Sequence, residues 1–401
     1  MKKGWELKKL GDVLIIERGG SPRPIEKYIT NSPNGLNWIK ISDATASDKY
    51  IYETKEKITR DGLHKTRVVN EGDFILSNSM SFGRPYIMKT SGCIHDGWLV
   101  LRQNGKKLFE TEFLYYLLSS PFVFNQFNEL AAGSTVRNLN IALVSSVTVP
   151  IPSLPEQLRI VHLLDEAFAS ISKAKANAEQ NLKNTRELFE NYLHRVFTNR
   201  GVEWEERTLG EVLLKTETVD PGRKPNEEFI YLDVSSVNKE TKEIENATIL
   251  LGKDAPSRAR KLVKTNDVIF ATVRPTHSRV ALITEEYDEQ VCSTGYFVLR
   301  PKEFLSYKLV YYFLLTPGFN KQMEKLQKGA SYPAVTDSEV KGIFIPFPKS
   351  KREQQSIVNK LDTLSSETKQ LESIYQQRLN DLEELKKSIL TKAFKGELKI
   401  S

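Results

Sequence analysis

Two long stretches of the chain place apolar residues in alternating steps of three and four. Residues 156–197 and 353–394 contain neither Pro nor Gly. At 1.5 Å per residue, each stretch predicts a helix roughly 60 Å long. Because a one-sided apolar stripe is unstable in water alone, we expect the two helices to pack on each other as an antiparallel coiled coil. Lys175 and Arg378 interrupt the two stripes, as residues that fix the register of paired helices do.

The residues expected in this helix seam share apolar character and heptad spacing. They are Val161, Leu164, Phe168, Ile171, Leu182, Phe189, Tyr192, Leu361, Leu364, Leu371, Tyr375, Leu382, Leu385 and Ile389.

The rest of the chain shows short apolar runs separated by Gly, Pro, Asn and Ser, which predicts mixed α/β (α+β) domains with mostly short strands. Apolar residues at helical spacing add an internal helix to each part, interrupted by Pro121 and by Pro317. The predicted organisation has four consecutive segments: a domain over 1–153, a helix over 154–200, a domain over 201–348 and a helix over 349–401.

These segments form two tandem copies. Residues 5–13 (WELKKLGDV) return as 204–212 (WEERTLGEV), and the boundary sequence at 149–152 (VPIP) returns at 345–348 (IPFP). A repeat of this length indicates a domain duplication rather than a short-period solenoid. It predicts pseudo-twofold symmetry and a target that itself has two halves.

Composition narrows the classes of function. The net charge of +7 and the pI near 9.0 favour a polyanionic partner. The excess is uneven, because residues 1–153 hold 20 Lys and Arg against 15 Asp and Glu, whereas residues 203–348 hold 20 against 22. A solvated surface of mixed charge is the alternative. No apolar run is long enough to span a bilayer and the start lacks a signal peptide, so we expect a cytoplasmic protein.

Catalytic and metal-binding signatures are missing from the sequence. It has no Walker loop, no Gly-x-Gly-x-x-Gly and no His-Glu-x-x-His motif. The five histidines lack ligand spacing, and Cys93 and Cys292 are interpreted as buried small hydrophobes. We therefore expect no catalytic residue, no metal and no cofactor in this chain. A nuclease or methyltransferase with an unrecognised site, or a coiled-coil adaptor without DNA binding, stays open as an alternative.

The order of several short sequence words carries a resemblance. Residues 19–23 (GGSPR), then 38–43 (WIKISD), then 133–135 (GST), lead to the boundary at 150–157 (PIPSLPEQ). The boundary recurs at the second junction, and residues 393–398 (AFKGEL) close the last helix. Over essentially the whole chain, this order resembles the specificity subunit of type I restriction-modification systems.

The resemblance implies that each globular part is a target-recognition domain reading one half of a bipartite, asymmetric site on double-stranded DNA. The paired helices would then set the distance between the half-sites. It also implies two methyltransferase subunits and restriction subunits as partners, which would use S-adenosylmethionine, ATP and Mg²⁺. The second copy has different loops, with residues 221–225 (PGRKP) and 329–334 (GASYPA) replacing the first copy's sequences. The two half-sites are therefore expected to differ.

Candidate DNA-binding residues follow from chemistry, because phosphates attract Lys and Arg, while short polar or bidentate side chains read base edges. Gly beside such residues allows close backbone approach. The candidates are Ser21, Arg23, Arg84, Ser134, Thr135, Arg137 and Asn138 in the first copy, and Arg223, Lys224, Arg274, His277, Arg279, Ser331 and Tyr332 in the second.

Overall fold

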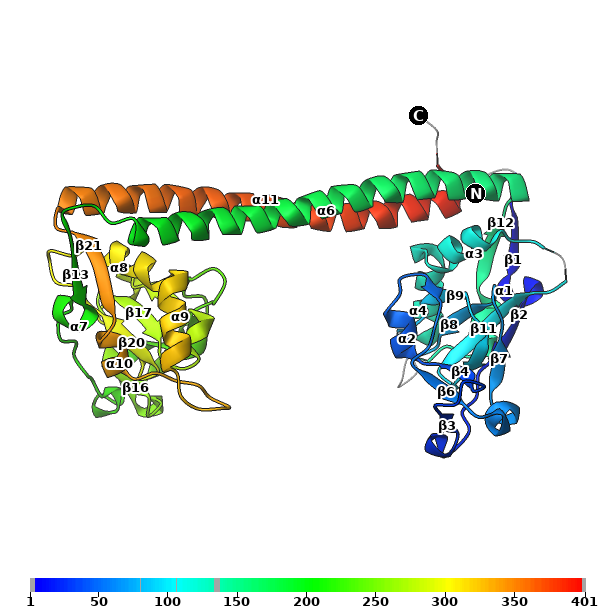
Figure 1. Cartoon of the computed structure of the whole chain (residues 1–401), viewed down its shortest axis with the longest axis horizontal. Helices are drawn as coiled ribbons and strands as arrows, with labels where there is room; N and C mark the ends of the chain where they lie inside the picture. The colour runs from blue at the N-terminus through cyan, green and yellow to red at the C-terminus, as the bar shows by residue number, and fades with distance from the viewer. Residues whose placement is uncertain (1–3, 80, 106, 133–137, 399–401) are drawn as a thin grey trace. The chain divides into compact units, whose positions relative to one another are not determined.

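The structure is a computed structural model that describes residues 4–79, 81–105, 107–132 and 138–398. It divides into two compact units, Met1–Ala178 with Gln377–Ser401 (unit 1) and Glu179–Gln376 (unit 2). Each unit contains one globular part, the beginning of one long helix and the end of the other (Figure 1).

Unit 1 is built on two five-stranded sheets, ordered β2-β11-β8-β9-β5 and β3-β6-β4-β10-β7. A separate antiparallel pair, β1 with β12, places Leu7 opposite Pro150 of the boundary sequence. The strands are β1 (Glu6–Lys9), β2 (Leu14–Arg18), β3 (Ile29–Thr30), β4 (Leu36–Ile39), β5 (Tyr50–Ile51), β6 (Glu56–Ile58), β7 (Arg67–Val69), β8 (Phe74–Ser77), β9 (Pro85–Met88), β10 (Gly92–Ile94), β11 (Trp98–Gln103) and β12 (Thr148–Ile151).

The short helices of unit 1 are α1 (Leu10–Val13), α2 (Ile41–Thr45), α3 (Thr111–Leu118), α4 (Pro121–Ala131) and α5 (Ile141–Ser146). Of these, α2 packs on one side of the first sheet, with Ala44 beside Ile75 and Tyr86, and the others cover the opposite side. Pro121 occupies the first turn of α4, where its missing N–H leaves no hydrogen bond unmade, and Ser120 caps that helix. The predicted interruption at Pro121 is therefore the boundary between α3 and α4.

Unit 2 repeats this arrangement with fewer strands. Its sheets are ordered β15-β14-β19-β16 and β18-β17-β20, and β13 pairs with β21 as β1 does with β12. The strands are β13 (Trp204–Thr208), β14 (Glu228–Leu232), β15 (Thr248–Leu251), β16 (Ala259–Leu262), β17 (Val268–Ala271), β18 (Val280–Leu282), β19 (Val291–Ser293), β20 (Tyr296–Leu299) and β21 (Phe344–Pro348). The helices are α7 (Leu209–Val212), α8 (Tyr307–Leu314), α9 (Pro317–Leu326) and α10 (Asp337–Lys341).

The duplication is confirmed in the strand pairing. Cys93 in β10 lies opposite Trp38 in a parallel pair, and Cys292 in β19 lies opposite Leu232 in the matching parallel pair. Both thiols are buried and free, as expected for small core residues. The mixed α/β prediction is also confirmed, since short strands and short helices alternate in each globular part.

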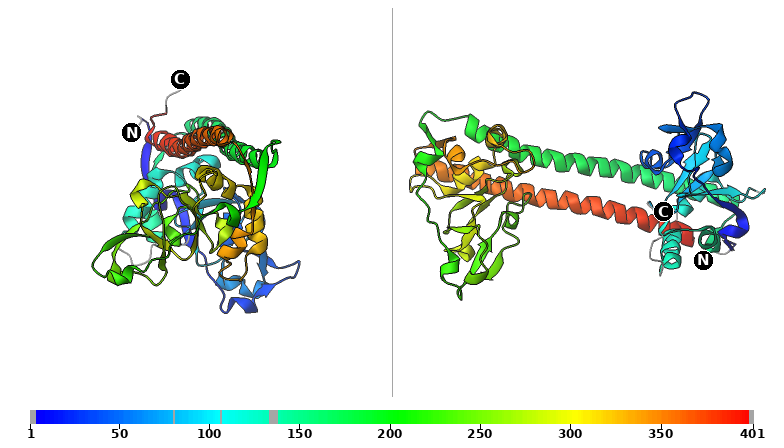
Figure 2. Two further views of the ribbon diagram at one scale, coloured as in Figure 1. Left: turned by 90° about the vertical axis from the view of Figure 1, so that its left-hand side faces the viewer. Right: turned by 90° about the horizontal axis from the view of Figure 1, so that it is seen from below.

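The long helices are α6 (Leu154–Thr198) and α11 (Lys351–Lys395). In unit 1, Lys175 Nζ pairs with Glu383 Oε1 at 2.7 Å. In unit 2, Arg186 Nε pairs with Glu372 Oε2 at 3.1 Å. These contacts join the two helices in antiparallel orientation, and their segments lie side by side within each unit (Figures 1 and 2).

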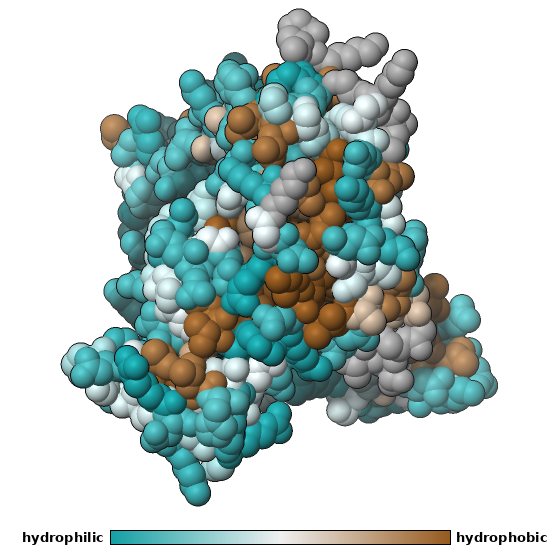
Figure 3. All heavy atoms as spheres, turned by 90° about the vertical axis from the view of Figure 1, so that its right-hand side faces the viewer, coloured by the Kyte–Doolittle hydropathy of each residue, from teal (hydrophilic) through white to brown (hydrophobic). Residues whose placement is uncertain are grey.

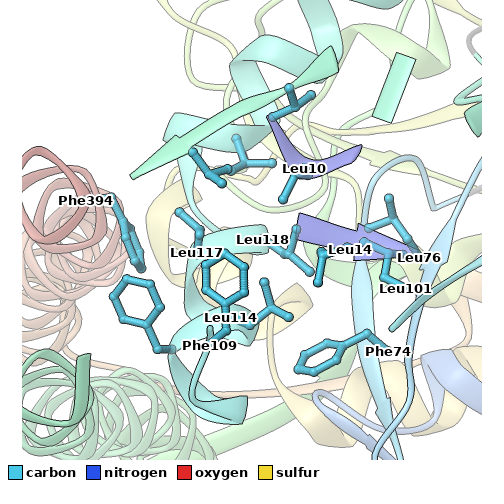
Figure 4. Packing of buried hydrophobic residues seen from close by; sticks show 14 of the residues in the cluster. Leu10, Leu14, Phe74, Leu76, Leu101, Phe109, Leu114, Leu117, Leu118 and Phe394 are labelled. Atoms are coloured by element: carbon cyan, nitrogen blue, oxygen red, sulfur yellow. The ribbon is translucent and has the colours of Figure 1, made fainter. Parts of the chain in front are cut away.

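The apolar ends of both helices enter the globular cores. In unit 1, Phe394 of α11 is 1% exposed and contacts the ring of Phe113 at 5.4 Å between centroids. Figure 4 shows Phe394 projecting from its helix toward the side chains of α3, among them Leu117. In unit 2, Phe197 of α6 contacts Phe313 of α8 at 5.5 Å. Each globular core is therefore completed by a residue from the end of a long helix.

The seam of α6 follows the predicted heptads, since none of its seven expected residues is exposed. Two residues expected in the α11 seam are corrected: Leu371 is 39% exposed and Leu385 is 47% exposed. Position 372 faces the seam instead of position 371, because Glu372 accepts the hydrogen bond from Arg186 across it. Thr368 is 4% exposed, so a small polar residue occupies a buried position of α11. A search for hydrophobic residues alone does not find this position.

Candidate nucleic-acid interface

Three loops meet at one corner of unit 2, at the end of β17. The amide of Thr272 donates to the carbonyl of Gly295 at 2.8 Å, and the amide of Val335 donates to the carbonyl of Thr272 at 2.9 Å. Residues 272–279, 294–295 and 329–335 are thereby joined, and we call them the loop corner of unit 2. The sequence places these loops far apart along the chain, so only the strand pairing brings them together.

The backbone of this corner adopts a conformation that residues other than Gly rarely take. Arg274 and Ser278 have φ values of 51° and 48°, in the left-handed region on either side of the short 3₁₀ turn Pro275–His277. The amide of Arg274 donates to the carbonyl of Pro333 at 2.7 Å, which holds the turn against the third loop. Such strain is common at functional sites, where surrounding contacts maintain it.

Cationic side chains gather on this strained turn. The guanidinium of Arg274 lies over the ring of Tyr332 at 5.3 Å, and Tyr332 is 72% exposed. The pKa of His277 is lowered by partial burial and by the nearby positive charges of Arg274, Lys239 and Arg279. Within the part of the chain that the structure describes, no carboxylate forms an ion pair with Arg274 or Arg279. The corner therefore offers positive charge to an anion from outside the chain.

Two other candidates of the second copy lie elsewhere. Arg223 and Lys224 flank the end of a 3₁₀ turn, where Lys224 pairs with Glu227 at 2.8 Å and Arg223 lies 3.9 Å from Asp220. Among the described residues, no contact connects them to Arg274. The structure brings together Arg274, His277, Arg279, Ser331 and Tyr332, and leaves these two cations apart.

Unit 1 has the matching corner. The amide of Asn78 donates to the carbonyl of Gly97 at 3.0 Å, and the amide of Leu139 donates to the carbonyl of Asn78 at 2.8 Å. The loop corner of unit 1 comprises residues 77–79, 81–84, 95–97 and 138–139. Asn138 is exposed there. Ser134, Thr135 and Arg137 lie outside the described residues.

Two further candidate residues contact the carboxylate of Asp96 at this corner. Ser21 Oγ donates to Asp96 Oδ1 at 2.7 Å, and Arg23 Nη2 lies 3.5 Å from Asp96 Oδ2. The hydrogen bond from Ser21 is the main reason why the pKa of Asp96 lies below its ordinary value. The carbonyl of Asp96 in turn accepts from Asn78 Nδ2 at 2.8 Å. Residues from the first 25 positions thus join the corner through Asp96.

Arg84 lies at the edge of the same corner, with different neighbours. Its Nη2 is 3.3 Å from Asp48 Oδ1, and its guanidinium lies over the ring of Tyr86 at 5.2 Å. Because Asp48 is fully exposed, the ion pair is weak and open to exchange. Arg84 can therefore bind an anionic ligand if its ion pair with Asp48 is broken.

Sequence reasoning missed several residues of the two corners. Asp96 and Asn78 are not basic and belong to no DNA-binding motif. Only their hydrogen bonds show that they are part of the unit 1 corner. Arg258 is exposed, and its carbonyl accepts from the amide of Thr294 beside the unit 2 corner. The basic run at residues 253–264 is the signal that could have identified Arg258.

The described residues contain no group of three or more His, Cys, Asp or Glu placed to hold a metal ion. None of the helices in these residues is both long and apolar enough to cross a membrane.

Comparison with known proteins identifies the same duplication. Residues 2–183 and 201–384 each match the sequence profile described as the type I restriction modification DNA specificity domain. The type I restriction enzyme MjaVIII specificity subunit of Methanocaldococcus jannaschii is 22% identical, over 99% of this chain and 93% of that protein. The EcoDI specificity subunit of Escherichia coli is 23% identical, over 73% of this chain and 71% of that protein.

Solved structures show a shared fold. A chain from a study of complex assembly and conformational transition in the type I R-M system aligns with a TM-score of 0.80 at 22% identity, over 99% of both chains. The HsdS subunit from Thermoanaerobacter tengcongensis aligns with a TM-score of 0.60 at 22% identity, over 99% of this chain and 98% of that one.

Proposed function

Because the chain belongs to the family of type I restriction-modification DNA specificity subunits, we propose that each loop corner reads one half of a bipartite, asymmetric DNA site. In this proposal residues 1–153 and 201–348 are the target-recognition domains, and the helices over 154–200 and 349–401 set the distance between half-sites. Family membership makes the chain a recognition subunit whose chemistry is performed by others.

The observation that carries this proposal is the cationic cluster at Arg274, whose two arginines form no ion pair within the described residues. An arginine can donate two parallel hydrogen bonds to the O6 and N7 atoms of guanine, or neutralise a phosphate. The neighbouring ring of Tyr332 offers an aromatic surface next to that cation. The left-handed backbone at Arg274 and Ser278 supports a functional role, because strained residues cluster at functional sites.

The two corners share a backbone plan and differ in side chains, which supports two different half-sites. Where unit 2 has the Arg274 and Tyr332 pair, unit 1 has Arg84 with Asp48 and Ser21 with Asp96. A protein that presents different donors and acceptors at equivalent positions would read different base edges.

We further propose methyltransferase subunits, two of them, and restriction subunits as protein partners. These subunits would supply the binding sites for S-adenosylmethionine, ATP and Mg²⁺, and the assembly would act on DNA in the cytoplasm. Remaining apolar surface supports protein partners. In unit 1, Leu7 and Ile15 are 51% and 43% exposed, and Figure 3 shows hydrophobic side chains gathered on one face of this unit.

The test uses the purified chain and duplexes that carry its site, identified by mapping modified adenine in the host genome. The logarithm of the association constant should fall with the logarithm of salt concentration, by about 0.9 per phosphate contact. Arg274→Ala should weaken binding by about 1–3 kcal/mol and relax recognition at one half-site only. Lys215→Ala, which removes an exposed cation outside the loop corner, is the matched control.

Two results would contradict the proposal. Binding that does not respond to salt would contradict DNA binding through phosphate contacts. Equal loss of recognition at both half-sites in Arg274→Ala would contradict the assignment of one half-site to each unit. Turnover by the chain alone with DNA, Mg²⁺, ATP and S-adenosylmethionine would instead favour an enzyme with its own catalytic site.

A further inference from the structure

In each unit, one loop connects the loop corner to a long helix. In unit 2 this bridging loop comprises residues 238–245. Its inner side holds the strained turn, because Lys242 Nζ donates to the carbonyl of Ser278 at 2.8 Å. Arg279 of the same turn donates to the carbonyl of Val237, directly before the loop. The bridging loop and the residue before it therefore contact the two residues that follow the turn Pro275–His277.

The outer side of the bridging loop is attached to α11. Lys369 Nζ lies 2.9 Å from Glu243 Oε1 and donates to the carbonyl of Thr241 at 3.2 Å. The loop is internally stiff, since Asn238 Nδ2 donates to both carboxylate oxygens of Glu245 at 2.8 Å. A displacement of Lys369 would consequently move the whole loop rather than one side chain.

A cavity of about 300 Å³ lies beside these contacts, lined among others by Ile244, Leu282, Tyr311 and Lys369. Dense apolar packing does not fill the space between the loop and the helix. Lys369 therefore holds the bridging loop on α11 through polar contacts, beside the contacts of Lys308 and Tyr312 with Asp362 of the same helix.

Unit 1 makes the same connection with different residues. Its bridging loop comprises residues 46–50. On the inner side, Asp48 pairs with Arg84 of the loop corner, and its carbonyl accepts from Tyr115 Oη at 3.0 Å. On the outer side, Lys49 pairs with Glu112 and lies 5.0 Å from the ring centre of Tyr116.

Tyr116 completes the path in unit 1, because its hydroxyl donates to Asp165 Oδ1 of α6 at 2.5 Å. The same contact recurs in unit 2, where the hydroxyl of Tyr312 donates to Asp362 Oδ1 of α11 at 2.7 Å. The contacts of the bridging loops themselves differ, because Lys369 binds the loop directly in unit 2, whereas Lys49 of the loop reaches Tyr116 in unit 1. In both units, therefore, a bridging loop and a tyrosine-aspartate hydrogen bond lie between the loop corner and a long helix.

We propose that the bridging loops are positioning elements, which fix the orientation of each loop corner on the long helices and thereby the base-pair spacing accepted between half-sites. This inference rests on the proposed function. Lys369 and Glu243 are the positioning residues of unit 2. Because these two residues act on the loop and not on a base, their loss changes which spacing is accepted and leaves the half-site sequences unchanged.

The experiment compares Lys369→Met and Glu243→Gln with the unaltered chain on duplexes whose spacer is the native length, one base pair shorter or one base pair longer. One step of B-DNA turns roughly 35°, from about 10 to 10.5 base pairs per turn. A domain held rigidly should reject the altered spacers. In each variant we expect the preference for the native spacer to fall by about tenfold, a value within the range for coupled contacting residues.

Lys360→Met is the matched control, because Lys360 is an exposed lysine on the same helix. The charge exchange Lys369→Glu with Glu243→Lys should restore the native preference, which a general loss of folding would not allow. In host cells, maps of modified adenine should show the same half-sites with additional spacer lengths.

The outcomes separate the two proposals. If the unaltered chain selects one spacer and Lys369→Met selects it equally strictly, the positioning role is wrong while the DNA-recognition function stands. A change of half-site sequence in Lys369→Met would also overturn it, since the residue would then act in base reading. If the unaltered chain fails to bind the split site at all, the proposed function is wrong first.

Discussion

Gln157 and Gln354 make the same three hydrogen bonds in the two units. Gln157 Oε1 accepts from the amide of Glu110 at 2.8 Å, and its Nε2 donates to the carbonyls of Leu108 and Pro152. Gln354 Oε1 accepts from the amide of Ser306 at 2.7 Å, and its Nε2 donates to the carbonyls of Phe304 and Pro348. Both side chains are buried, so the repeated Glu-Gln sequence anchors the start of each long helix to its globular part.

Removal of this anchor should destabilise the corresponding unit. Gln354→Ala leaves the amide of Ser306 and two carbonyls without their partner, and an unsatisfied buried group costs about 1–3 kcal/mol. We expect a lower midpoint of thermal unfolding for unit 2, measured by calorimetry on the full chain. Gln355→Ala, at the next and exposed position, should leave the midpoint unchanged. Equal midpoints for both variants would show that the anchor contributes nothing.

The buried ion pair of unit 2 provides a second test. Arg300 donates to both oxygens of Asp267 at 2.8 Å, and Asp267 is 1% exposed. Asp267→Ala should cost about 3–5 kcal/mol, because it leaves a poorly hydrated positive charge without its main partner. Replacing both residues, as Asp267→Leu with Arg300→Met, should recover part of that loss. Denaturant unfolding measures both, and a double variant less stable than Asp267→Ala would contradict this explanation.

The first unit should depend on the last helix. Phe394→Ala removes a ring from the core beside Phe113, and loss of a buried Phe costs about 3–5 kcal/mol. Amide exchange in α3 should therefore accelerate, although the two residues are far apart in the chain. Leu385→Ala is the control on the same helix, since Leu385 is 47% exposed. Comparable destabilisation by both changes would mean that Leu385 is packed after all.

Both thiols should be unreactive in the folded chain. Burial raises the pKa of Cys292 to about 12 and also raises that of Cys93. A raised thiol pKa favours the folded state below the ordinary pKa, about 8.5, and this contribution declines as pH rises further and the unfolded thiol ionises. A thiol reagent at pH 8 should react with neither cysteine before denaturation. Immediate reaction of either would show that the core around it is open.

The helices should set the distance between half-sites. Four residues inserted after Gln180 and four after Gln377 lengthen both helices by about 6 Å and rotate them by about 40°. One base pair advances about 3.4 Å and turns about 35°. If groove orientation decides, the spacer should lengthen by about one base pair, at most two, with unchanged half-sites. Adenine methylation mapping measures this, and an unaltered spacer with retained activity would exclude the helices as the determinant.

Several features followed from the sequence because they depend on local periodicity or on repetition. The heptads of α6 predicted its seam, since every expected residue from Val161 to Tyr192 is at least half-buried. The second seam was less predictable. Leu371 is more hydrophobic than Glu372, yet Glu372 faces the partner helix because Arg186 pairs with it there. A contact across two helices has no signal in either helix alone.

Part of the candidate interface could likewise be predicted from the sequence, and part depends on the tertiary structure. Arg274, His277 and Arg279 could be proposed from residue type, and they lie together because they are close in the chain. Tyr332 joined them only through the pairing of Val273 with Ala334. Arg223 and Lys224 are the same residue types as the cations of the corner, but they lie on a separate 3₁₀ turn beside the local carboxylates of Asp220 and Glu227.

The sequence by itself determined the duplication, the helix lengths and the family, because repeats, periodicity and ordered motifs are properties of one chain read in order. Tertiary structure decided which loops form a corner, which cations remain unpaired and where the helix ends are anchored. Those features depend on contacts between residues tens to hundreds of positions apart, such as the hydrogen bond between Asn78 and Leu139 or the ring contact between Phe113 and Phe394. Their partners are chosen by the packing of strands and helices, which no local pattern specifies.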